Sequence, residues 1–388
     1  MPIYQQLGRI PRKRHLAFRA PDGSLHPEEL VGNKGFSGPS SLLYHLRLPT
    51  AVKSVRPFRD LTWEAEADRT LRHRHFRTAG LETGPSAVLD RVPLLFNADA
   101  ALQMVRPQVE DDFFYRNGQG DEVVFVTEGE GALESSFGIV SFRAGDYLVI
   151  PRGILHRYRF TARPLRFLVI ESRGDVRTPR RYRNDHGQLL EGAPYSERDI
   201  RRPAGLETRD ETGDFRILVK TANRLTEMVL AHHPFDVVGW DGYYYPWALS
   251  IHDFEPRVGR THLPPPVHQT FEGDGFVVCS FCPRPYDFDK EAVPAPYSHS
   301  NVMSDEVLYY ANAEFMSRRG TEFGSITLHP DGLPHGPQPG RTEESIGATW
   351  TNELAVMVDT FRPLRASRQA LALEDPSYRL SWIGTLGE

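Results

Sequence analysis

The stretch YSHSNVMSDEVLYY, residues 297–310, places several polar and ionisable side chains inside an otherwise apolar run. They include His299, Asn301, Asp305 and Glu306, which is unusual for a core strand because buried charges need partners. An earlier stretch, YRNGQGDEVVFV, has nearly the same pattern but begins with Tyr115 where the later one has histidine. The likeness of two such distant stretches indicates an internal repeat.

The repeat extends beyond these two stretches. Residues 115–122 align without a gap with residues 299–306, 184 positions further along the chain. A second pattern follows in each half, GDYLVIPRGILH at 145–156 and GSITLHPDGLPH at 324–335, and both read G-x5-P-x-G-x2-H. Two long patterns that recur in the same order predict a duplicated domain.

The composition favours a β-rich globular chain. Of 388 residues, 39% are hydrophobic and 25% charged, while 32 glycines and 31 prolines favour many short strands joined by turns over long helices. The formal net charge is −5 with both signs interspersed, which gives no electrostatic case for a nucleic-acid partner.

The chain shows no targeting or membrane signal by pattern. Its first residues, MPIYQQLGRIPRKRH, lack the apolar segment of a secretory signal, and no apolar run approaches the roughly 20 residues of a membrane helix. Cys279 and Cys282 are the only cysteines, so a disulfide framework is excluded. We therefore expect a cytoplasmic protein without a membrane partner.

The paired patterns resemble the two signatures of the cupin β-barrel, ordinarily H-x-H-x4-E followed by G-x5-P-x-G-x2-H. The resemblance implies an all-β bicupin, with two double-stranded β-helix (jelly-roll) barrels and an irregular N-terminal extension. We expect an extension and oligomerisation segment over residues 1–85. We expect a cupin-like barrel lacking a full metal site over 86–240, and a catalytic cupin barrel over 241–388. Inward-pointing side chains at a barrel mouth can converge on one ion.

The second half supplies a set of candidate metal ligands. The first signature selects His299, Asn301 and Glu306, and the second adds His335. Because asparagine replaces one histidine, two imidazoles and one carboxylate remain. That set is the facial triad of non-haem Fe(II), which leaves three positions open for substrate and dioxygen. This ligand set favours iron over zinc, and it does not exclude manganese or nickel.

Either of two adjacent carboxylates could complete this set. Strict strand alternation from His299 puts Asp305 on the same face, whereas a bend at residues 303–305 would reset the phase, and the signature spacing selects Glu306. We favour Glu306 as the ligand and Asp305 as a turn or supporting group, with the reverse assignment open.

The first half has a poorer ligand set. It keeps Glu122 and His156, but Tyr115 stands at the position of His299. Two ligands are too few for a competitive site, so we expect a structural relic there. Outside the signatures, His268 follows a proline run (THLPPPVHQTF), and loop histidines of this kind are candidates for function.

Further stretches extend the resemblance to one enzyme family. They are GFSGPSSLLYHLRLP near the N-terminus, HPFDVVGWDGYYYP from residue 233, the segment 299–320, and LPHGPQPG around His335. Together they resemble homogentisate 1,2-dioxygenase over nearly the whole chain, in a divergent bacterial branch. The resemblance implies a ferrous enzyme that opens homogentisate with O2 to maleylacetoacetate, in tyrosine and phenylalanine catabolism. It also implies a homo-oligomer, a trimer or a hexamer.

The resemblance also implies roles for single residues. By motif, His299, Glu306 and His335 hold the iron, and His268 helps to deprotonate the phenol.

Four residues match positions around the substrate in that family. Asn301 and His329 match residues that line the pocket, and His335 adjoins the substrate as well as the metal. A tyrosine that contacts substrate in the family falls on Phe315, and this departure removes a hydroxyl donor. A pocket built to bond a polar group is sensitive to one missing partner.

Two alternatives therefore stay open. The absent hydroxyl at Phe315 favours a relative that acts on another dihydroxylated aromatic acid, such as gentisate or a pathway-specific quinol. A different class of function is a cupin isomerase or a non-catalytic bicupin that binds a metal or ligand.

Overall fold

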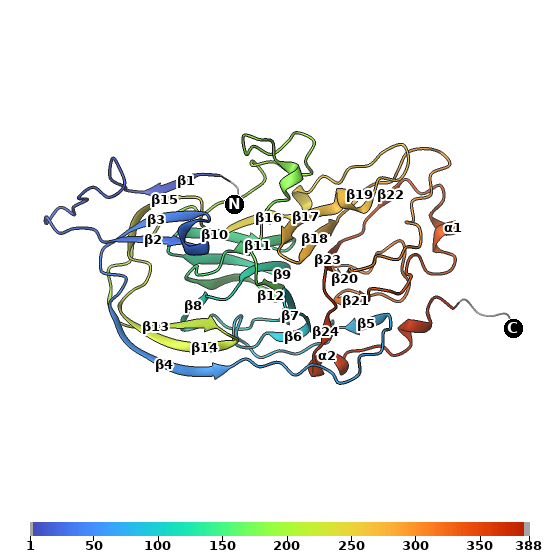
Figure 1. Ribbon diagram of the computed structural model, residues 1–388, viewed down its shortest axis with the longest axis horizontal. Coiled ribbons are helices and arrows are strands. Elements are labelled where there is room, and N and C mark those ends of the chain that lie inside the picture. The colour runs from blue at the N-terminus through green and yellow to red at the C-terminus, as the bar shows by residue number, and fades with distance from the viewer. Residues whose placement is uncertain (1–2, 384–388) are drawn as a thin grey trace.

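A computed structural model describes residues 3–383, and they form a nearly all-β molecule (Figure 1). The α-helices in this range are short, α1 (Arg341–Ser345) and α2 (Arg368–Leu371). Single 3-10 turns lie at Lys34–Phe36, Arg180–Tyr182, Ile251–Asp253, Pro265–His268 and Tyr378–Leu380. None of the helices in residues 3–383 has the length and apolar character needed to cross a membrane.

The first barrel is built on a twelve-stranded sheet. Its strands are β4 (Val52–Asp60), β6 (Val92–Phe96), β7 (Ala100–Val105), β8 (Phe114–Asn117), β9 (Asp121–Ser135), β10 (Gly138–Arg143), β11 (Asp146–Ile150), β12 (His156–Ser172), β13 (Thr212–Thr221), β14 (Arg224–His232), β16 (Trp247–Ser250) and β24 (Arg365–Ala366). The main path runs β16-β11-β9-β12-β8-β13-β14-β4, with β8 and β13 parallel and the other pairs antiparallel.

The second barrel is built on a six-stranded sheet ordered β17-β18-β23-β20-β21-β5. Its strands are β5 (Arg74–Arg77), β17 (Gln269–Gly273), β18 (Phe276–Phe281), β20 (Asp305–Tyr310), β21 (Ser325–His329) and β23 (Ala355–Thr360). A two-stranded ribbon, β19 (Arg284–Pro285) with β22 (Trp350–Thr351), accompanies it.

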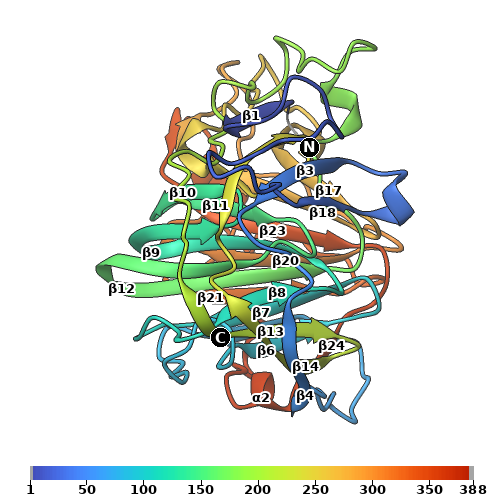
Figure 2. The ribbon, with the colours of Figure 1, turned by 90° about the vertical axis from the view of Figure 1, so that its left-hand side faces the viewer.

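A separate four-stranded sheet combines three N-terminal strands with β15, in the order β1-β15-β3-β2. These are β1 (Gln5–Gly8), β2 (Glu28–Gly32), β3 (Ser40–His45) and β15 (Val237–Gly242). Figure 2 shows β1 and β3 near one end of the molecule and β4 and β14 near the other, with β9 and β12 between them.

Strands from the predicted N-terminal extension join both barrels. β4 pairs with β14 in the first barrel, and β5 pairs with β21 in the second. β16, which lies beyond residue 240, pairs with β11 of the first barrel. The three-part division at residues 85 and 240 stays a prediction, and so does the oligomerisation role of residues 1–85.

The internal repeat is visible in the strand pairing, which confirms the bicupin fold. Tyr115 is paired with His156 in the first half, and His299 with His335 in the second. The glycines of both G-x5-P-x-G-x2-H patterns have φ between 79° and 91°. Glycine adopts this left-handed backbone conformation without steric cost, so the pattern sets tight corners before each histidine.

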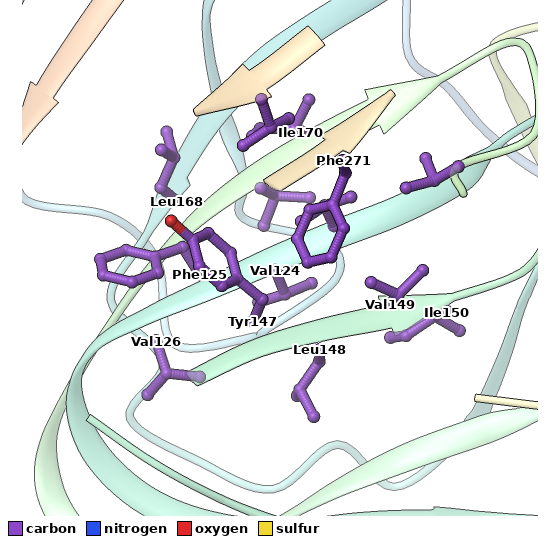
Figure 3. Packing of buried hydrophobic residues seen from close by; sticks show 14 of the residues in the cluster. Val124, Phe125, Val126, Tyr147, Leu148, Val149, Ile150, Leu168, Ile170 and Phe271 are labelled. Carbon is purple, nitrogen blue, oxygen red and sulfur yellow. The ribbon is translucent and has the colours of Figure 1, made fainter. Parts of the chain in front are cut away.

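The two barrels share one hydrophobic core. Figure 3 shows Tyr147 of β11 beside Phe271 of β17, and their ring centroids are 5.3 Å apart. The same core contains Val123 and Phe125 of β9 together with Val307 of β20, all fully buried. Burying apolar surface contributes about 25 cal/mol per Å², so this common core fixes the barrels against each other.

Hydrogen bonds also join the barrels through the core. The Tyr147 hydroxyl lies 2.8 Å from Ser280 Oγ, and Thr127 Oγ1 lies 2.9 Å from the Tyr309 hydroxyl. These two hydrogen bonds each pair a buried hydroxyl of one barrel with a hydroxyl of the other.

Candidate metal centre

Three of the predicted residues converge at one point in the second barrel. Candidate ligand atoms of His299, Glu306 and His335 all lie within 4.8 Å of one another. The Nε2 atoms of the two histidines lie 3.7 Å and 3.6 Å from Glu306 Oε2. The structure therefore brings together the ligand set expected from the sequence.

The backbone explains why Glu306, and not its neighbour, faces the histidines. Met303 has a φ of +64°, and the turn there precedes β20 and resets the side-chain phase. The carboxylate of Asp305 is occupied elsewhere, since it accepts backbone N–H groups from Asp331 at 2.8 Å and Leu364 at 2.7 Å. Asp305 thus anchors the loops that follow β21 and β23.

Both histidines point the same ring atom into the centre. His299 Nδ1 lies 3.1 Å from the carbonyl oxygen of Tyr297, and His335 Nδ1 lies 3.2 Å from that of Leu333. A carbonyl oxygen accepts only, so each Nδ1 carries the proton and each Nε2 presents a lone pair.

The unsatisfied atoms of the centre fit a metal ion. His335 Nε2 is buried and has no hydrogen-bond partner among residues 3–383. Metal-binding histidines ordinarily donate the other ring N–H to a carbonyl or carboxylate, as both do here. Two neutral imidazoles and one carboxylate are the donors that divalent first-row metals take.

A further histidine holds the carboxylate in place. His329, at the end of β21, places Nδ1 2.7 Å from Glu306 Oε1 and Nε2 3.0 Å from the Tyr378 hydroxyl. Burial, followed by the charge of Arg318, lowers the pKa of His329 to about 3, so the ring is neutral. Its Nδ1–H therefore donates to Glu306, and Tyr378 donates to its Nε2.

The histidines also set the charge state of Glu306. Burial acts to raise the pKa of Glu306, but its three histidine neighbours, His299, His329 and His335, outweigh it and hold that pKa well below its usual range. The carboxylate is therefore ionised at neutral pH, as a metal ligand must be.

A cavity of about 460 Å³ opens beside the centre. Its wall includes His299 and Glu306 and three more predicted residues, His268, Asn301 and Phe315. The structure places His329 elsewhere, fully buried behind Glu306 and outside the lining residues. His329 thus contacts the carboxylate, whereas the sequence predicted a place in the pocket wall.

Aromatic rings form one side of this cavity. His268 stacks on Phe281 with ring centroids 4.6 Å apart, and Phe315 packs against both Phe281 at 5.6 Å and Tyr310 at 5.1 Å. Burial, followed by the charge of Arg284, lowers the pKa of His268 to about 3. Its buried Nδ1 has no partner among the described residues, so a neutral acceptor adjoins the cavity.

Sequence reasoning missed an acidic residue in the cavity wall. Asp359 of β23 lies directly across the sheet from Glu306 and lines the cavity. Burial, followed by the nearby charge of Glu306, raises the pKa of Asp359. An aspartate inside the strand-like run AVMVDT was the available signal, but only the strand register shows that it faces the metal centre.

The corresponding point of the first barrel contains an arginine. Arg91 donates to both carboxylate oxygens of Glu122, at 2.8 Å and 2.9 Å, and Tyr115 and Asn117 also donate to Glu122 Oε1. His156 keeps the orientation seen in the second barrel, with Nδ1 3.0 Å from a carbonyl oxygen and Nε2 without a partner among residues 3–383. A guanidinium thus supplies the positive charge beside this carboxylate.

Comparison with known proteins places these features in a family. Residues 99–251 match the family model described as homogentisate 1,2-dioxygenase N-terminal. A protein from Saccharolobus solfataricus named "Putative dioxygenase SSO1533" is 41% identical over 385 residues, covering 98% of this chain and 99% of the relative.

Homogentisate 1,2-dioxygenase of Nitrobacter hamburgensis is 27% identical over 304 residues, which cover 74% of this chain and 66% of that enzyme. Among solved structures, a cupin 2 conserved barrel domain protein from Leptotrichia buccalis aligns with 75% of this chain and 98% of its own, at 9% identity and a TM-score of 0.36. The chain belongs, as a divergent member, to the homogentisate 1,2-dioxygenase family.

Proposed function

We propose that this protein is a ring-cleaving non-haem Fe(II) dioxygenase that converts homogentisate and O2 to maleylacetoacetate. The observation that carries the proposal is the convergence of two imidazole Nε2 atoms and one carboxylate beside a cavity. This ligand set is typical of ferrous oxygenases, because it leaves positions open for substrate and dioxygen. The relatives named homogentisate 1,2-dioxygenase support the same chemistry.

In this proposal His299, Glu306 and His335 hold the ferrous ion. When bound, the ion supplies Lewis acidity toward a phenol oxygen and a reducing centre for dioxygen. His329 and Tyr378 keep the carboxylate of Glu306 in one orientation, since His329 bonds the oxygen that does not face the other two histidines. Fixing a ligand in this way preserves the geometry of the open positions.

The cavity wall orients the substrate. A dihydroxylated ring with an acetate side chain fits between the aromatic side chains, and Asn301 can bond one of its polar groups. The unpaired Nδ1 of neutral His268 accepts the proton of the hydroxyl next to the acetate side chain as that oxygen approaches the centre. Holding the ring in one orientation makes the attack on it effectively intramolecular.

Phe315 favours a second candidate from the same class of reaction. Its ring contributes no hydroxyl to the cavity, where the family resemblance places a tyrosine. A substrate whose polar groups are placed differently, such as gentisate with its carboxylate directly on the ring, would lose nothing by this change. We therefore propose another dihydroxylated aromatic acid as the alternative substrate.

Oxygen consumption tests these proposals. The protein is loaded with Fe(II) and ascorbate without air and then mixed with aerated homogentisate, gentisate or a wider set of quinols. Oxygen uptake with homogentisate and a new ultraviolet-absorbing product supports the first proposal, and uptake with another quinol alone supports the second. Metal binding without oxygen uptake for any ring would contradict both and support a non-oxygenase, metal-binding bicupin.

The expectations on assembly and location stay predictions. We expect a homo-oligomer, either a trimer or a hexamer. We also expect a cytoplasmic protein that has no nucleic-acid or membrane partner.

A further inference from the structure

The carboxyl group of Asp359 is poorly satisfied for its position. Its Oδ1 is buried and has no hydrogen-bond partner among residues 3–383, although the side chain lines the cavity beside the metal centre. Leaving a buried polar atom unpaired costs about 1–3 kcal/mol, so such atoms are rare in native proteins. An unpaired acid in a cavity wall is positioned to form a hydrogen bond with a molecule that enters the cavity.

The first barrel provides an internal control for this position. Glu122 is paired across the sheet with Glu171 in the same way that Glu306 is paired with Asp359. Each barrel therefore carries two acids side by side on neighbouring strands, and the groups that bond these acids differ between the barrels.

In the first barrel the second acid is fully satisfied from within the chain. Glu171 forms an ion pair with Lys220, whose side chain is 4% exposed, and accepts from Gln119 at 2.7 Å and Asn117 at 3.2 Å. The described residues provide no equivalent donor to Asp359 Oδ1. The second barrel thus leaves open the position that the first barrel fills with its own side chains.

The nearby arginines are engaged with other groups. Arg284 pairs with the buried carboxylate of Glu353 at 2.9 Å and donates to a backbone carbonyl at 3.1 Å. Arg318 donates to the carbonyl oxygens of Ser317 and Gly336. Neither arginine donates to Asp359, although Arg318 Nε is buried without a partner among residues 3–383, so Asp359 is free to bond a group that enters the cavity.

We propose that Asp359 determines specificity by holding a ring hydroxyl of the substrate, the one that lies away from the metal. This inference rests on the proposed function, which supplies an aromatic diol with one hydroxyl directed to the ion. A carboxyl group can share a hydrogen bond with a hydroxyl, whereas a second carboxylate placed beside Asp359 and Glu306 would be repelled. The pocket therefore selects a ring with a neutral hydroxyl at that point.

Three ring compounds test the inference by direct binding to iron-loaded protein without oxygen. Homogentisate has both hydroxyls, 2-hydroxyphenylacetate lacks the hydroxyl remote from the side chain, and 3-hydroxyphenylacetate lacks the one next to it. We expect Asp359→Val to weaken the binding of homogentisate and 3-hydroxyphenylacetate roughly 10- to 100-fold, because the remote ring hydroxyl is then left buried without a partner. Binding of 2-hydroxyphenylacetate should not change.

Two further measurements separate this role from a structural one. Asp359→Asn keeps a hydrogen-bonding oxygen of nearly the same shape and should recover most of the homogentisate affinity. Iron affinity and thermal unfolding, measured on the unliganded variants, should match those of the unsubstituted protein.

Several outcomes would overturn the inference. If Asp359→Val weakens the binding of all three compounds equally, or of none, Asp359 does not bond a substrate hydroxyl. Loss of iron in Asp359→Val would show that Asp359 acts on the ion. If the unsubstituted protein binds iron but none of the three rings, the proposed function is wrong and this inference is wrong with it. Normal binding with no effect of Asp359→Val would contradict the inference alone.

Discussion

Arg91 donates to both carboxylate oxygens of Glu122 in the first barrel, at 2.8 Å and 2.9 Å, and the two side chains are 5% and 0% exposed. Burial acts to raise the pKa of Glu122, but the charge of Arg91 outweighs it and lowers that pKa to about 2. The pair occupies the position that corresponds to the candidate metal centre of the second barrel. The duplicated fold therefore neutralises one buried acid with a side chain, and we propose that the other binds an ion.

Removing Arg91 should strongly destabilise the first barrel. In Arg91→Met the Glu122 carboxylate stays buried without its cation, and we expect a loss of about 3–5 kcal/mol in the free energy of unfolding. Chemical denaturation, monitored by tryptophan fluorescence, measures the change. The double variant Arg91→Met/Glu122→Gln should recover a large part of it, because both charges are then absent.

An exposed ion pair provides the matched control. Arg224 and Asp60 lie 2.7 Å apart with side chains 72% and 65% exposed, so Arg224→Met should cost less than about 1 kcal/mol. A small effect of Arg91→Met, similar to that of Arg224→Met, would show that the buried pair does not stabilise the barrel.

Tyr378 should influence metal affinity through His329. In Tyr378→Phe the ring of His329 loses the hydroxyl that donates to its Nε2, so the donor to Glu306 is less well oriented. We expect metal binding, measured by anaerobic calorimetry, to weaken roughly tenfold. Tyr310→Phe is the control, since it removes a similarly buried hydroxyl that bonds Thr327. Equal metal affinity in the two variants would argue against this role.

Phe315→Tyr should test which substrate the cavity accepts. The new hydroxyl lies at the position where the family resemblance places a tyrosine, and one added hydrogen bond should raise kcat/KM for homogentisate about tenfold. Steady-state oxygen uptake with homogentisate and gentisate gives the comparison. A gain with gentisate alone, or a loss with both rings, would count against homogentisate as the substrate.

The buried His45 should make stability depend on pH. Burial acts to lower the pKa of His45, but its ion pairs with Asp236 at 2.7 Å and Glu29 at 3.2 Å raise that pKa to about 9. Because the folded-state pKa exceeds the unfolded value, the stabilisation is fully present below about pH 6.5 and is lost as the pH rises through 9. We expect it to amount to roughly 3 kcal/mol.

The difference in unfolding free energy between the unsubstituted protein and His45→Gln isolates this contribution. It should be largest near pH 6 and should shrink between pH 7 and 9. A constant difference across that range would mean that the histidine is not charged in the folded protein.

The sequence predicted the fold and the convergence of His299, Glu306 and His335, because both follow from short motifs that recur in each half of the chain. The G-x5-P-x-G-x2-H patterns set corners whose glycines adopt the left-handed region, and these corners bring His335 back beside His299. The choice of Glu306 over Asp305 was also predictable from the signature spacing. The turn at Met303 and the two backbone hydrogen bonds of Asp305 explain it physically.

The residues around the ligands were not predictable in the same way. Asp359 reaches the centre through the pairing of β20 with β23, and Tyr378 through the packing of a C-terminal segment against His329. Arg91 lies 31 positions before Glu122 and outside both signatures. Contacts of this kind depend on strand register and tertiary packing, which no short motif encodes.

Metal content is the most direct test of the central claim, that two imidazoles and one carboxylate in the second barrel hold one ferrous ion. Protein reconstituted with Fe(II) without air, freed of excess metal and analysed by mass spectrometry for iron should contain one ion per chain. The His299→Ala variant should contain almost none, and Tyr115→Ala, at the matching position of the first barrel, should still contain one. Retention of iron by His299→Ala, or its absence from the unsubstituted protein, would contradict the account.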